Sequence, residues 1–176
     1  MTPLQRFPSA GLRRWASAAL WFLTLWATGT CAADRLDDSA SPRSRVQAAS
    51  VMSDEGRPLA DSLAPTRAIV RVGQVDYKLA TARYLGRQAR IYHVIPAVIS
   101  GLRSPMGLQV QWRGLAGFAS GSARPGERSL VWSGRITEAF MTATLDLSMQ
   151  IDLRAVQLPA SGNFGVESYF EIEATP

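Results

Sequence analysis

The 176-residue sequence predicts an all-β fold, a single antiparallel β-sandwich of six to eight strands, immunoglobulin-like or similar. Apolar and polar residues alternate in several short segments, which is the pattern of strands with one buried face. Turn signals separate these segments, and no amphipathic helical pattern exceeds two turns. Two sheets of one-sided strands close on each other as a sandwich.

The clearest strand is the segment TLDLSMQIDL, Thr144–Leu153. Its apolar residues share one parity and its polar residues the other, and successive strand side chains point to opposite faces. The predicted buried face consists of Leu145, Leu147, Met149, Ile151 and Leu153. The predicted outer face consists of Asp146, Ser148, Gln150 and Asp152.

The other strands are expected between turn signals. We place them at residues 68–72, 75–85, 88–99, 108–114, 128–136 and 164–174. Gly73 marks a turn or bulge between the first two, and Pro96 ends or interrupts the third because proline cannot donate to a ladder. The pair Pro125-Gly126, which suits a type II turn, closes a long loop at residues 115–127.

Residues 1–33 have the order of a secretory signal peptide. Arg6, Arg13 and Arg14 precede an apolar run of about fifteen residues, and small residues follow it. The run is short for a membrane-spanning helix, which needs about twenty apolar residues. We therefore expect export to the periplasm, the cell surface or the medium. The residues before Cys31 lack the usual leucine of a lipidation site, so no lipid anchor is expected there.

Residues 34–66 are expected to form a disordered linker, and residues 67–176 the sandwich domain. The linker is rich in Ser, Ala, Asp, Arg and Pro, has no aromatic residue, and shows no apolar period. Cys31 is the single cysteine, and it lies in the signal segment. The mature chain therefore has no cysteine, and a packed core rather than disulfides must hold the domain.

Charge is distributed unevenly along the chain. Residues 67–135 hold eleven basic and two acidic side chains, whereas residues 136–176 hold one basic and six acidic ones. We interpret this as pairing of strands from the two halves within one molecule. An anionic surface partner and head-to-tail contact between copies are the alternatives, because an unbalanced field attracts partners of opposite sign.

The sequence offers little for catalysis. His93 is the single histidine and stands between apolar neighbours, so neither a structural zinc site nor a catalytic triad is expected. Asp146 and Asp152 would lie roughly 20 Å apart, too far for a glycosidase pair. Glu171 and Glu173 would lie about 7 Å apart on a terminal strand, where consecutive glutamates are typical of a solvated face. We predict a non-enzymatic protein without metal or cofactor.

These observations favour an exported structural or assembly subunit of the cell envelope. In general architecture the chain resembles fimbrial subunits of the chaperone–usher kind, although residues 34–66 lack the apolar alternation that a donor strand needs. The alternative is a binding module for a glycan or another anionic envelope ligand, and a small hydrolase ranks last. Protein partners, self-association or an anionic glycan are expected, and export argues against nucleic acid. The candidate ligand or partner surface comprises Arg83, Arg87, Arg90, Arg113, Trp112, Glu167, Glu171 and Glu173.

Overall fold

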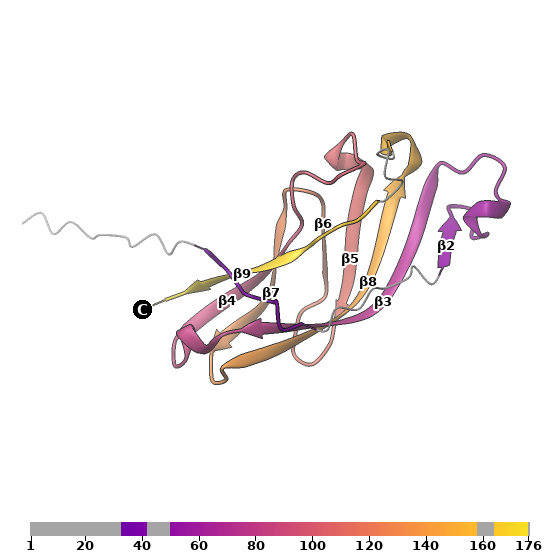
Figure 1. Cartoon of the computed structure of the whole chain (residues 1–176). Coiled ribbons are helices and arrows are strands. Elements are labelled where there is room, and N and C mark those ends of the chain that lie inside the picture. The colour runs from indigo at the N-terminus through magenta and orange to yellow at the C-terminus, as the bar shows by residue number, and fades with distance from the viewer. Residues whose placement is uncertain (1–32, 42–49, 158–163, 176) are drawn as a thin grey trace, which may run out of the picture. The chain divides into compact units, whose positions relative to one another are not determined.

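The computed structural model describes residues 33–41, 50–157 and 164–175, and this part of the chain forms two antiparallel sheets. The strands are β1 (Asp34–Arg35), β2 (Ser50–Ser53), β3 (Arg67–Ala80), β4 (Gln88–Val94), β5 (Leu108–Gly114), β6 (Gly121–Ala123), β7 (Arg128–Arg135), β8 (Phe140–Asp152) and β9 (Tyr169–Ala174). One sheet has the order β1-β9-β4-β7 and the other β2-β3-β8-β5-β6 (Figure 1). The predicted all-β sandwich is confirmed, but the described residues contain nine strands rather than six to eight.

Short 3-10 helices connect several of these strands. They are η1 (Leu59–Asp61), η2 (Ala82–Tyr84), η3 (Pro105–Gly107) and η4 (Leu153–Ala155). Helix η2 replaces the end of a strand that was predicted to continue to residue 85. Leu153, predicted as the last buried residue of its strand, instead begins η4. No helix in the described ranges has the length and hydropathy to cross a membrane.

The strands β3 and β8 form the centre of the five-stranded sheet. They pair from Arg67, opposite Asp152, to Ala80, opposite Phe140, with a register shift between Arg71 and Gly73. Gly73 has a positive φ of 85°, which glycine adopts without a steric cost. The predicted bulge at Gly73 is therefore confirmed, and it lies inside one continuous strand.

Alternation located most of the strands correctly. β5 has the predicted bounds, and β4 ends at Val94, two residues before Pro96. β9 begins only at Tyr169, although Phe164 and Val166 still pack against the core from the preceding irregular segment. The predicted loop at residues 115–127 contains the short strand β6 and ends in a turn in which Gly126 has a φ of 87°.

The segment predicted as a disordered linker contributes to both sheets. Within its described residues, β1 pairs with β9 and β2 pairs with β3. Leu36 is buried, and its amide donates to the carbonyl of Phe170. The prediction of disorder is wrong for residues 34–41 and 50–66, because strands of two and four residues add to a sheet edge through backbone hydrogen bonds that need no apolar alternation.

The core lies between the two sheets and confirms the one-sided pattern of β8. Leu145, Leu147 and Ile151 are buried, Met149 is half-buried, and the residues of opposite parity are more exposed. The opposing sheet supplies its own buried residues, Ile91, Val131, Phe170 and Ile172. Burial of these aliphatic and aromatic side chains is the main source of the domain's stability.

A close backbone approach explains the glycine at the end of β5. A Cβ atom on Gly114 would lie 2.1 Å from the carbonyl oxygen of Phe118. We therefore expect Gly114→Ala to lower the free energy of unfolding by about 2 kcal/mol, because the backbone of the following loop must move. Gly165→Ala is the control, since a Cβ there meets no atom within 4 Å. Urea denaturation measures both, and equal stability of the two variants would contradict the close approach.

Candidate functional site

The structure does not gather the predicted site residues into one place. Arg90 (β4) lies opposite Glu173 (β9), with Glu171 two residues away on the same strand face. The remaining exposed residues are separate: Arg83 in η2, Arg87 before β4, Arg113 on the other sheet, and Glu167 in the segment before β9. Of the predicted site residues, Arg90, Glu171 and Glu173 therefore lie next to one another, on the outer face of the four-stranded sheet.

The outer-face cluster consists of Tyr92, Arg128, Glu171 and Glu173. Nη2 of Arg128 lies 2.8 Å from Oε1 of Glu173, and its Nη1 donates to Oε2 of Glu171 at 3.4 Å. The Tyr92 hydroxyl donates to Oε2 of Glu173 at 2.9 Å, and the Arg128 guanidinium stacks 4.4 Å above the centre of the Tyr92 ring. Arg128 comes from β7 and the two glutamates from β9, on either side of β4.

This geometry pairs Glu173 with Arg128 in the ionised form of both side chains. The hydrogen bond from Tyr92, followed by the bond from Arg128, lowers the pKa of Glu173. The hydrogen bond to Glu173 in turn raises the pKa of Arg128. A carboxyl group that acts as a general acid needs a raised pKa, whereas the pKa of Glu173 is lowered. The cluster instead joins the basic and acidic halves of the chain, which confirms their predicted pairing within one molecule.

Trp112 lies almost entirely in the core, although it also borders the polar groove described below. It is only 4% exposed, and its Nε1 donates to the carbonyl of Ala119 at 3.1 Å. Its parity in β5 is that of the buried residues Leu108 and Val110, so its indole belongs to the core. Tyr84, which follows the predicted site residue Arg83 in η2, is buried as well.

His93 lies in an aromatic cluster in the core. It is 0% exposed, stacks on Phe170 with ring centres 5.0 Å apart, and meets the edge of Trp112 at 4.6 Å. Neither ring nitrogen has a hydrogen-bond partner among the described residues, and burial lowers the pKa of His93 to about 4. The histidine is a packed strand residue, as the sequence indicated, and has no nucleophile to activate in this cluster.

A polar groove of about 810 Å³ runs across the outer face of the five-stranded sheet. Its principal side chains are Arg71, Gln111, Arg113, Ser122, Asp146 and Ser148. They come from β3, β8, β5 and β6. Arg113 is the one predicted site residue among these six, and the predicted Trp112 also borders the groove from the core side. The others were missed because each is an ordinary outward residue of an alternating strand, and only strand pairing places them side by side.

A second candidate surface is the loop end of the five-stranded sheet (Figure 1). We define the loop end as residues 54–67, 95–107, 124–127 and 152–157. Backbone bonds join its parts: Leu153 donates to Thr66 at 3.0 Å, Arg103 to Ala155 at 2.8 Å, and Ile95 to Glu127 at 3.1 Å. Separate connections of the chain therefore form one continuous surface.

The loop end carries the most exposed large apolar side chains in the described residues. Leu63 is 104% exposed, Val98 88% and Met106 68%. The other large apolar residues at the surface, Leu85, Leu130 and Phe140, are each about half exposed and lie outside the loop end. We therefore take the loop end as a candidate protein interaction surface.

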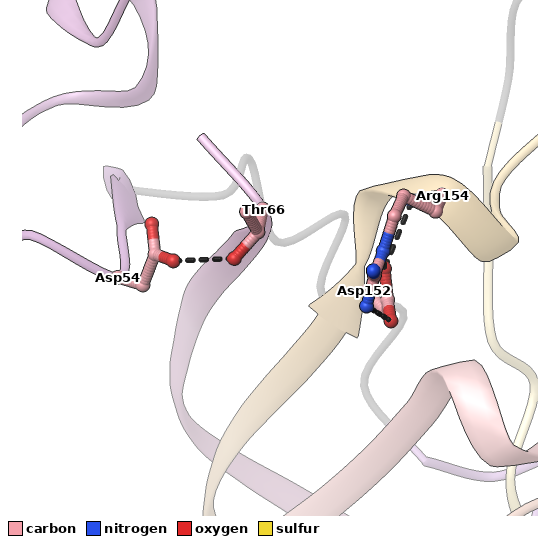
Figure 2. A network of polar contacts seen from close by, with 4 residues as sticks. All are labelled: Asp54, Thr66, Asp152 and Arg154. Atoms are coloured by element: carbon pink, nitrogen blue, oxygen red, sulfur yellow. Dashed lines mark hydrogen bonds and ion pairs between the residues drawn. The ribbon is translucent and has the colours of Figure 1, made fainter. Parts of the chain in front are cut away.

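Polar contacts hold several charged residues of the loop end, as Figure 2 shows for two pairs. The Thr66 hydroxyl donates to Oδ2 of Asp54 at 2.6 Å, and this bond lowers the pKa of Asp54. Arg154 binds Asp152 through its side chain, with Nη2 2.9 Å from Oδ2, and lowers the pKa of that carboxyl. The loop end holds five arginines and five acidic residues. Its net charge is therefore zero.

Comparison with known proteins adds no assignment to these surfaces. In the described ranges, no group of three or more His, Cys, Asp or Glu side chains is arranged to hold a metal ion. The chain matches no protein-family model, no curated protein and no solved structure.

Proposed function

We propose that this protein is an exported, non-enzymatic component of the cell envelope that acts as a structural or assembly subunit through its loop end. The observation that carries the proposal is the exposure of Leu63, Val98 and Met106 on one hydrogen-bonded set of loops. Burial of exposed apolar side chains of this size against a partner lowers the free energy of the system. The signal-like residues 1–33 support export.

The partner we propose for the loop end is another copy of this chain. Exposed apolar side chains of one copy can pack against those of a second copy, and a two-fold contact brings the same surface of two copies together. The balanced charges of the loop end favour neither an anionic membrane nor a polyanion, both of which select net positive surfaces. A two-fold contact through a single surface closes a dimer, and this dimer is the assembly unit that we propose.

Photocrosslinking at Val98 tests this role. With p-benzoylphenylalanine in place of Val98, irradiation of cells that export the protein should give an adduct of twice the monomer mass. The same probe at Thr142, exposed on the outer sheet face beyond the loop end, is the control and should give no such adduct. A Val98 probe that yields no adduct, or adducts of equal yield at both positions, would contradict assembly through the loop end.

A second candidate function is a binding module for a glycan. The polar groove favours it, because hydroxyl, amide and charged side chains from four strands line one open depression of about 810 Å³. Sites that bind small ligands commonly have volumes of about 300 to 1,000 Å³. The two functions use different surfaces, since the groove lies on a sheet face and the loop end at the strand termini.

A further inference from the structure

We infer that the polar groove binds an acidic glycan, with Arg71 as the residue that receives a sugar carboxylate; this inference rests on the second candidate function. The groove lies on strands whose inner faces are packed in the core, so its side chains project from a rigid support. Arg71 belongs to β3, and β8, β5 and β6 supply the rest of the surface.

The depression has a physical origin in side-chain length. Across the sheet, Arg71 lies in register with Ser148, Ser148 with Gln111, and Gln111 with Ser122. In this row Ser148 lies between the longer side chains of Arg71 and Gln111, and Ser122 lies beyond Gln111. Gly73 and Gly121 at the groove add no side chain of their own. Short residues between long ones leave a channel open across the strands.

The neutral groups of the groove suit a polyhydroxylated ligand. Gln111 offers both amide donors and a carbonyl acceptor, and the hydroxyls of Ser122 and Ser148 donate and accept. Sugars present hydroxyls of the same dual character at regular spacing. A chain of sugar rings laid across the strands can therefore exchange hydrogen bonds with each of these side chains in turn.

The charged groups give the groove a preference for anions. Arg113 forms an ion pair with Asp146, with Nη2 3.2 Å from Oδ2, and the arginine side chain is 71% exposed. Arg71 has no ion pair with any described residue, and its side chain is exposed. The groove thus has a net charge of +1, with one guanidinium available for the bidentate pairing that carboxylates form with arginine.

Calorimetric titration with tetragalacturonate, and with its methyl ester, tests the inference on the purified protein. The ester keeps the sugar hydroxyls and removes the charge. We expect saturable binding of the acid and at least tenfold weaker binding of the ester. Arg71→Gln should weaken binding of the acid at least tenfold, whereas Lys78→Gln should leave it unchanged, because Lys78 is exposed on the same strand but lies outside the groove.

The outcomes separate the two levels of the proposal. Equal affinity for the acid and the ester, or an Arg71→Gln variant that binds the acid as wild type does, would overturn the carboxylate assignment and leave a neutral-glycan site. Absence of binding for both ligands would overturn the glycan function of the groove as well. Far-UV circular dichroism of Arg71→Gln confirms that a loss of affinity reflects the missing guanidinium rather than unfolding.

Discussion

Leu145→Asp is expected to abolish folding of the domain. Leu145 lies at the centre of β8 and is 0% exposed. The substitution places an unpaired carboxylate between the sheets, which costs several kcal/mol, and removes a packed leucine at about 2 to 5 kcal/mol more. The sum is comparable to the total stability of about 5 to 15 kcal/mol that is typical of single domains. Circular dichroism and thermal denaturation measure the loss.

Gln150→Asp provides the matched control in the same strand. Gln150 has the opposite parity and lies on the outer face, in register with Ile69 and Gln109. The same introduced carboxylate should there meet water, and the thermal transition should stay close to that of wild type. If Leu145→Asp also kept a cooperative transition near that of wild type, the assignment of the buried face of β8 would be wrong.

The stability of the protein should fall by about 3 kcal/mol between pH 7 and pH 4 because of His93 alone. Burial lowers the pKa of His93 to about 4 in the folded state, whereas an unfolded histidine titrates near 6.5. Well above pH 6.5 the imidazole is neutral in the folded and in the unfolded state, so its titration does not change the free energy of unfolding. As the pH falls toward 4, the unfolded state binds the proton first and is stabilised by it.

His93→Phe tests this titration. Phenylalanine keeps an aromatic ring beside Phe170 and Trp112 and cannot bind a proton in this range. Carboxylates such as Glu173 titrate in both proteins, so the difference between the two pH profiles isolates the histidine. We expect the free energy of unfolding, from urea denaturation at several pH values, to depend less on pH in the variant. Parallel profiles would contradict a buried neutral imidazole.

The sequence predicted those elements in which side-chain alternation and strand structure coincide. In β8 the apolar residues at alternate positions determine which face is buried, and β5 was located to the residue for the same reason. Proline and glycine marked the end of β4 and the bulge in β3, because each restricts the backbone in a specific way. The charge distribution predicted strand pairing correctly, as the pairing of β3 with β8 and of β4 with β9 shows.

The candidate surfaces were far less predictable. The short strands β1 and β2 pair through backbone hydrogen bonds, which require no particular side chains. Their sequences therefore carry no strand pattern and resemble a linker in composition. The buried position of Trp112 follows from its parity, but an aromatic residue beside arginines also fits a binding surface. The polar groove depends on the register of four strands that are far apart in the sequence, and no local pattern contains that register. The exposure of Val98 and Met106 depends on how the connecting loops pack.

Sedimentation velocity of the purified protein over a range of concentrations tests the proposed assembly most directly. It compares wild type with the variant Leu63→Ser, Val98→Ser, Met106→Ser at about 0.01 M and about 1 M salt, which changes the screening length from about 30 Å to about 3 Å. Contact through the apolar loop end predicts self-association of wild type at both salt concentrations and a monomeric variant. Wild type that stays monomeric at every concentration, or an association that survives the triple substitution and disappears in high salt, would contradict it.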